Sequence, residues 1–372
     1  MTDEAAATST PGRSLWADAL ARLRANKAAM ASLYFLGLMV VLCVAGPWFT
    51  PHDFSTIYQD YTRVPPSLNA YPKADAIDAA VRDAVKRGRL DLVGWQERDG
   101  RIFITMAAKK PIDERVTRYI DRSDVFSDAK VSEKSADGLV LTVSAAIEKQ
   151  YFLFGTDSTG RDLLTRTLIA GRVSLAIGLL AGLVAGVIGV LYGAVSGFVG
   201  GRTDEIMMRI VDVLYSLPFI FFVIMLVVFF GRNFVLMFLA VGAVMWLDMA
   251  RIVRGQALSL KRQEYVQAAE ALGVSPAGIL LRHVVPNLLG PVVIYMTLLV
   301  PQVIILESFL SFLGLGVQEP MSSWGVLIAQ GARGIPSANW LLVFPSLFLT
   351  LTLFALNFIG DGLRDALDPK DR

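Results

Sequence analysis

Few side chains in this sequence have the types and spacing that catalysis or metal binding requires. The 372 residues include one cysteine, Cys43, and two histidines, His52 and His283, which lie far apart and outside any cluster. A single thiol cannot form an internal disulfide, and two isolated imidazoles do not make a metal site. Ser174 and Ser308 have no histidine that a motif places beside them, so a hydrolase is not indicated.

Phosphate chemistry is also unsupported by the sequence. It has no GxxxxGK[ST] loop, the pattern whose backbone amides hold nucleotide phosphates. If ATP drives this protein, another chain must hydrolyse it. The formal net charge of +2 gives no basic surface for nucleic acid. We therefore expect no catalytic residues, no metal and no cofactor in this chain, which is not an enzyme by itself.

A polar stretch at residues 264–287, EYVQAAEALGVSPAGILLRHVVPN, interrupts the apolar second half of the chain. Its first part consists mostly of good helix formers, and Gly273 suits the left-handed residue that ends a helix. Ser275 can cap a second helix with Pro276 in its first turn, and Pro286 is expected to close it. Two short helices at a membrane surface can present an end to a partner protein.

This stretch resembles the EAA loop, a cytoplasmic loop of ATP-binding-cassette importer permeases. The family pattern is Glu-Ala-Ala, three residues, Gly, nine residues, then Ile-x-Leu-Pro. The spacing is kept by Ala268, Ala269, Gly273 and Pro286, whereas Gln267, His283 and Val285 depart from the pattern. In the family the loop forms a coupling helix that docks into a groove of the ATPase subunit. The resemblance implies a coupling role for Glu264, Tyr265, Gln267, Ala268, Ala269, Gly273 and Pro286.

Composition indicates a polytopic membrane protein. Hydrophobic residues make up 54% of the chain and charged residues 18%, with a mean hydropathy of +0.52; this is too apolar for a soluble protein of this length. Residues 28–49 are expected to form an uncleaved first span, preceded by residues 1–27 with an interfacial helix over 14–26. Five further spans are expected at 173–199, 210–230, 234–253, 288–309 and 340–359. The predicted fold is all-α with six transmembrane helices.

Residues 50–153 have the composition of a soluble insertion. Apolar residues at helical spacing predict a helix over 75–90. A hairpin is expected around the Arg98-Asp99-Gly100 turn, with a further strand at 139–143. We therefore expect a small α+β insertion before a core over 154–372. Its role stays open between a docking surface for a partner and a passive spacer or lid.

The spans contain small and ionisable residues that predict helix contacts. Glycines spaced by four at 178, 182 and 186, and at 189, 193 and 197, allow two helices to approach closely. Asp248 and Arg251 are three apart and can interact on one helix. Asp212 and Asp248 are interpreted as contacts between helices rather than a proton relay. Asp212 and Glu307 are the candidates for a translocation path.

Three further expectations concern segments outside the apolar runs. In FGTDSTGRD, Asp157 and Ser158 can cap a helix that begins near Gly160. Residues 200–209 are expected to be a charged turn and 360–372 a charged tail, while 312–334, rich in glycine, are expected to be re-entrant or interfacial. With six spans, the basic short segments fall on one face, which the positive-inside rule makes cytoplasmic. Both termini and the loop at 255–287 are then cytoplasmic, and the insertion is periplasmic.

Longer strings strengthen the resemblance. FGTDSTGRDLL, ESFLSFLGLGVQEPMSSWG and LNFIGDGLRDALDPKDR look like the C-type permease subunit of the oligopeptide and dipeptide importers, over roughly 14–50 and 150–372. The resemblance implies the type I importer fold in a bacterial inner membrane. It implies as partners a B-type permease, two ATPase subunits that hold ATP and Mg, and a periplasmic peptide-binding protein. The insertion departs from the family, whose members have a shorter segment there.

Two rival functions are weaker. A secondary transporter or channel with a periplasmic ligand-binding module would need ionisable residues near the middle of its spans, whereas those here lie near the ends. A membrane receptor would need fewer spans and a signalling domain. The sequence does not predict the length or sequence preference of a peptide.

Overall fold

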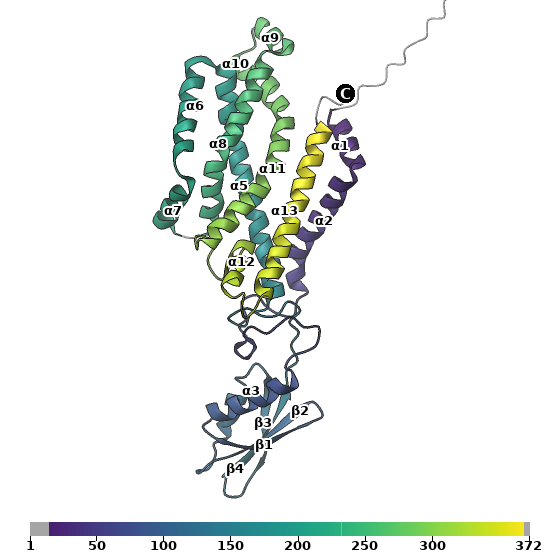
Figure 1. Cartoon of the computed structure of the whole chain (residues 1–372), viewed down its shortest axis with the longest axis vertical. Coiled ribbons are helices and arrows are strands. Elements are labelled where there is room, and N and C mark those ends of the chain that lie inside the picture. The colour runs from purple at the N-terminus through teal and green to yellow at the C-terminus, as the bar shows by residue number, and fades with distance from the viewer. Residues whose placement is uncertain (1–14, 232, 368–372) are drawn as a thin grey trace, which may run out of the picture. The chain divides into compact units, whose positions relative to one another are not determined.

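The computed structural model describes residues 15–231 and 233–367. The chain folds as two compact units. The first combines residues up to Ala45 with Ala170–Ile328 and Ser346 onward, and the second combines Gly46–Ile169 with Ala329–Pro345. Figure 1 shows the helical and the sheet-containing parts.

Helices make up the membrane part of the chain (Figure 1). In chain order they are α1 (Leu15–Ala25), α2 (Lys27–Ala45), α5 (Leu163–Val199), α6 (Gly201–Ser216), α7 (Phe219–Phe230), α8 (Phe234–Lys261), α9 (Glu264–Ala271), α10 (Pro276–Ile279), α11 (Val285–Phe312), α12 (Trp324–Arg333) and α13 (Trp340–Leu367). Five described helical segments are long and apolar enough to cross a membrane, and six if α6 and α7 are counted as one bent span. This agrees with the expected all-α membrane fold at the level of five to six spans.

Two expected helix boundaries were wrong. Residues 200–209 are not a charged turn: α6 begins at Gly201, and the chain bends by 85° before α7, because Pro218 lies at the break. The predicted tail is helical as far as Leu367, and residues 368–372 lie outside the described residues. Residues 1–14 also lie outside them, so only α1 represents the expected N-terminal segment. Within the predicted re-entrant segment, Trp324–Arg333 forms α12.

The two glycine series of α5 contact two different helices. A Cβ at Gly178 would lie 2.7 Å from Ile304 of α11, and one at Gly186 would lie 2.8 Å from Met296. A Cβ at Gly193 would lie 2.4 Å from the carbonyl oxygen of Ala250 in α8. The predicted close helix approach is confirmed, and it occurs with α11 along the first series and with α8 along the second.

The insertion contains one main helix and a four-stranded antiparallel sheet (Figure 1). Its elements are α3 (Ala74–Arg87), β1 (Asp91–Arg98), β2 (Arg101–Ala107), α4 (Thr117–Ile120), β3 (Phe126–Lys134) and β4 (Val140–Ile147), with strand order β1-β2-β4-β3. The apolar stripe of α3, including Val81 and Val85, packs with alternate residues of β2 and β4 such as Ile104 and Val143. That shared core holds the helix on one face of the sheet.

The hairpin turn is confirmed. Arg98 pairs with Arg101, so Asp99 and Gly100 form the two-residue turn. Their φ angles are +52° and +72°, the left-handed conformation that this turn requires at both positions. The strand β3 was not predicted, because its register shifts twice against β4 and its exposed positions break the apolar alternation.

Candidate functional site

The polar loop between α8 and α11 is the candidate site, and two of its turn residues behave as predicted. Gly273 ends α9 with a φ of +75°. The Ser275 side chain accepts a hydrogen bond from the Gly278 amide at 3.2 Å, with Pro276 in the first turn of α10. The Val274 amide donates to the Ala269 carbonyl oxygen, which closes the end of α9 in the manner of a glycine-terminated helix.

The loop divides into an inward and an outward face. Val266 and Ala269 of α9 are buried with Ile279 of α10 and Val284 in the same cluster. That cluster also includes buried residues of α5, α8 and α11, so apolar packing holds α9 against these helices. Leu272 at the tip is 84% exposed. The side chain leaves apolar surface beside the turn at Gly273 that a partner protein can bury.

The structure distributes the predicted coupling residues over both faces. The exposed residues are Glu264, Tyr265, Gln267, Ala268, Gly273 and Pro286, whereas Ala269 is buried. The Gln267 amide nitrogen donates to the Arg262 carbonyl oxygen at 3.3 Å, which ties α9 to the end of α8. Partial burial raises the pKa of the Tyr265 phenol above its usual value.

Pro286 does not close the second loop helix as expected. The chain passes from α10 through a π-helical turn, Leu280–Val284, directly into α11. Pro286 lies in the first turn of α11, where a missing amide hydrogen is tolerated. The wider π turn separates the two helical registers, and the Asn287 side chain donates to the His283 carbonyl oxygen at 2.6 Å. The second half of the loop is therefore continuous with a span.

A cluster that sequence reasoning missed fixes the helices next to the loop. Asp204 of α6 accepts two hydrogen bonds from the Arg254 guanidinium of α8, at 2.6 and 2.5 Å. It also accepts a bond from the Ser196 hydroxyl of α5. Such a two-pronged ion pair fixes orientation as well as distance. Asp204 lies among other charged residues at 200–209, which were interpreted as a turn, so the sequence alone did not single it out.

The two candidates for the translocation path, Asp212 and Glu307, have different hydrogen-bond partners. Asp212 of α6 is paired with Arg251 of α8 at 2.9 Å, and the guanidinium also lies 4.2 Å from the centre of the Tyr215 ring. The expected Asp248–Arg251 pair on one helix was wrong, since Arg251 bridges to α6 instead. Glu307 of α11 is completely buried.

Glu307 accepts hydrogen bonds from α11 itself and from the loop before α12. The donors are the hydroxyl of Ser311 at 2.7 Å and that of Ser323 at 2.6 Å. The Ser323 hydroxyl also accepts from the Val326 amide and so begins α12. These contacts give the buried carboxyl a structural anchor within the chain, and Asp212 and Glu307 are not brought into a shared site.

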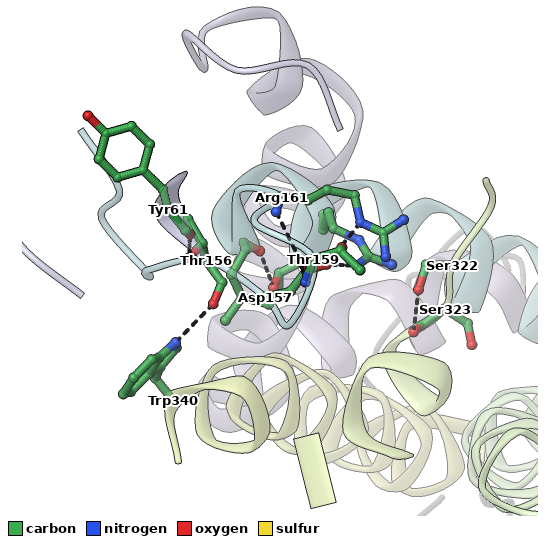
Figure 2. A network of polar contacts seen from close by, with 11 residues as sticks. Tyr61, Thr156, Asp157, Thr159, Arg161, Ser322, Ser323 and Trp340 are labelled. Atoms are coloured by element: carbon green, nitrogen blue, oxygen red, sulfur yellow. Dashed lines mark hydrogen bonds and ion pairs between the residues drawn. The ribbon is translucent and has the colours of Figure 1, made fainter. Parts of the chain in front are cut away.

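A second polar network lies in the other unit, before α5. Figure 2 shows Asp157 with Thr159 and Arg161, and the Trp340 indole nitrogen donating to the Thr156 carbonyl oxygen. Asp157 also pairs with Arg166. Burial acts to raise the pKa of Asp157, but the charges of Arg166 and Arg161 and the hydrogen bonds outweigh it and hold that pKa below its usual value.

The helix expected from Gly160 starts later. Asp162, rather than Asp157 or Ser158, caps α5: its carboxylate accepts from the Thr165 amide and hydroxyl, each at 2.7 Å. Asp157 instead closes the preceding turn by accepting from the backbone amides of Thr159 and Arg161. The predicted capping role of Asp157 and Ser158 was therefore wrong, and the ion pair of Asp157 with Arg166 joins positions nine apart.

Comparison with known proteins decides the family. Residues 189–372 match the family model for the inner membrane component of binding-protein-dependent transport systems. Residues 14–66 match the N-terminal transmembrane domain of oligopeptide transport permease C. The OppC permease protein of the oligopeptide transport system of Haemophilus influenzae is 42% identical over 361 residues, which cover 97% of this chain and 90% of the relative. The chain belongs to this permease family.

Other relatives agree with this assignment. OppC of Escherichia coli K12 is 64% identical over 219 residues, 59% of this chain and 72% of that protein. DppC, the dipeptide transport permease of Bacillus subtilis 168, is 37% identical over 370 residues, 99% of this chain and 90% of the relative. Among solved structures, one of the MetNI methionine ABC transporter has a TM-score of 0.46 at 17% identity, covering 53% of this chain and 94% of that chain.

The membership establishes a membrane-embedded permease component of a larger transport system. The Escherichia coli relative is shorter than this chain, because the same 219 matched residues make up 72% of that protein and 59% of this one. The Haemophilus influenzae and Bacillus subtilis relatives, in contrast, match 97% and 99% of this chain, so the expectation that family members have a shorter segment in place of the insertion was wrong for them.

Proposed function

We propose that this chain is the C-type permease subunit of an ATP-driven importer for oligopeptides and forms half of the translocation path. The observation that carries the proposal is the exposed tip at Leu272, held on a buried base in a chain that belongs to the permease family. The relatives named for oligopeptide and dipeptide transport support the substrate class. ATP is hydrolysed by separate ATPase subunits, which are proposed to hold ATP and Mg.

The proposed complex contains a B-type permease, two ATPase subunits and a periplasmic peptide-binding protein. In this arrangement the loop at 255–287, with its basic residues, faces the cytoplasm of a bacterial cell, together with both termini. The insertion at 50–153 then faces the periplasm. The coupling loop contacts an ATPase subunit through its exposed residues, whereas Ala269 packs in the buried cluster that holds α9 in place.

The composition of the complex is tested by purifying the tagged chain from its native membrane in mild detergent. We expect the second permease and both ATPase chains to co-purify, and reconstituted vesicles to accumulate a labelled oligopeptide only with ATP and binding protein. Recovery of the chain alone across several detergents, together with uptake that needs no ATP, would favour a secondary transporter.

The coupling role is tested with two leucine variants of equal exposure. Leu272→Asp places a charge on the loop tip, where the side chain is 84% exposed, and Leu68→Asp does the same in the insertion, where it is 85% exposed. We expect Leu272→Asp to reduce ATP-dependent peptide uptake and retention of the ATPase subunits, because the tip must be desolvated on docking. Leu68→Asp should do neither. Equal behaviour of both variants would remove the loop from the coupling.

A further inference from the structure

A groove in the insertion has no part in the coupling described above. Its volume is about 520 Å³, which is in the size range of sites for small ligands. One wall is a face of α3 that includes Asp75, Ala79 and Asp83. The opposite wall comes from the segment before α3 and includes Tyr61 and Arg63.

Tyr61 lines this groove, and its buried hydroxyl is unsatisfied in the described part of the chain. Its side chain is only 2% exposed, and within the described residues its hydroxyl has no hydrogen-bond partner. Phe152 and Tyr71 hold the ring, with centroid distances of 5.4 and 6.3 Å. Figure 2 shows the hydroxyl directed away from Thr156. Because buried hydroxyls are normally hydrogen-bonded, this atom points to a ligand group that accepts from it.

The groove also has unpaired charges of both signs. Arg63, Asp75 and Asp83 are exposed, and no ion pair involves them in the described part of the chain. Asp60 and Arg87, which also line the groove, are paired with each other at 3.4 Å. A ligand of a single charge would meet a repelling group in this groove, whereas a zwitterion finds a partner for each end.

The shape of the groove fits an extended chain. Asp75, Ala79, Asp83 and Arg87 are spaced by four on one face of α3, and a helix rises about 18 Å over those twelve residues. At about 3.3 Å per residue, that length matches an extended peptide of about five residues. Alanine at position 79 leaves room for the peptide backbone to lie close to the helix.

We propose that this groove binds a short zwitterionic peptide in an extended conformation. The Tyr61 hydroxyl donates to a peptide carbonyl oxygen. Arg63 and Lys73, which both line the groove, pair with the terminal carboxylate, and Asp83 accepts from the terminal ammonium group. The choice of a peptide as the ligand rests on the proposed import of oligopeptides. The insertion then gives this permease a second contact with substrate, separate from its membrane spans.

The groove is tested by calorimetric titration of the full chain in lipid nanodiscs with pentaalanine. We expect Asp83→Asn to weaken binding about tenfold, the usual effect of losing one charge-assisted hydrogen bond. Tyr61→Phe keeps the ring and should weaken binding about threefold to tenfold. Asp78→Asn is the matched control, because Asp78 lies on α3 but binds Arg82 and Trp95 outside the groove. Pentaalanine blocked at both ends should bind at least tenfold more weakly than the free peptide.

Two results would overturn the groove proposal. One is the absence of binding by the unmodified chain at millimolar pentaalanine. The other is equal affinity of the unmodified chain and both groove variants, with blocked and free peptide bound alike. ATP-dependent uptake by the whole complex, measured in parallel, separates the two proposals: if uptake persists while the groove binds nothing, the importer function stands and only the groove fails.

Discussion

Gly193→Ala tests whether α5 and α8 are in contact through glycine. The added Cβ would lie 2.4 Å from the Ala250 carbonyl oxygen, 2.9 Å from the Val253 Cβ and 3.0 Å from the Arg254 amide nitrogen. Two of these three atoms are backbone, so the clash cannot be relieved by a side-chain rotation. The helices must separate, and overpacking of this kind costs about 1–3 kcal/mol.

The assay compares variants with the same chemical change but different surroundings. Gly255→Ala is the matched control, because a Cβ there meets nothing within 4 Å. Gly182→Ala is intermediate, since its nearest neighbours are the side-chain ends of Val300 at 3.3 Å and Met296 at 3.5 Å. Thermal unfolding of the purified chain in detergent, followed by tryptophan fluorescence, should rank Gly193→Ala several degrees below Gly182→Ala.

Gly255→Ala should melt at or slightly above the unmodified protein, because alanine is the better helix former by about 1 kcal/mol. The separation of α5 from α8 should also weaken the Ser196–Asp204 contact between α5 and α6. Equal melting temperatures of Gly193→Ala and Gly255→Ala would refute the close packing of α5 on α8.

Three further perturbations have defined outcomes. Asp157→Asn leaves Arg166 buried beside a neutral group, so it should lower the free energy of unfolding by about 3 kcal/mol at pH 7. Because the pKa of Asp157 is lowered in the folded chain, the difference in stability between variant and unmodified chain should shrink in thermal melts as the pH falls below about 4. Burial and then the charge of Asp60 raise the pKa of Asp124. The unmodified chain therefore loses stability as the pH rises through that pKa, and Asp124→Asn should become more stable relative to it. A difference in unfolding free energy between the two that stayed the same from pH 4 to pH 8 would contradict this prediction. Gly273→Val imposes a φ of +75° on a β-branched residue, so ATP-dependent uptake should fall while membrane insertion, assayed by fractionation, stays intact.

Local sequence rules predicted the features that depend on a few adjacent residues. The turn at Asp99 and Gly100, the Ser275 cap and the left-handed Gly273 each follow from backbone preferences of single residues. The glycine series on α5 was also recognised, because a spacing of four places small residues on one helix face. The sequence did not indicate that the two series contact different helices.

Features decided by distant partners were not predicted. Arg251 has Asp248 within reach on its own helix but pairs with Asp212, thirty-nine positions away, because α6 packs against α8. Asp204 was missed for the same reason, since its bonds to Ser196 and Arg254 join three helices. Pro286 was read by its usual role of ending a helix, whereas the π turn before it lets the helix continue.

The uninterrupted path from α10 through the π turn into α11 has a mechanical consequence. Residues 276–312 form one helical segment of 37 residues, a lever about 55 Å long. If this lever pivots near its middle, a rotation of about 10° displaces each end by about 5 Å, roughly one helical turn. The π turn at Leu280–Val284 and the prolines at 291 and 301 are the compliant points of the lever. The stiffness of the segment at these points determines how much of a displacement at Pro276 is transmitted to Phe312 and how much is lost to bending of the helix.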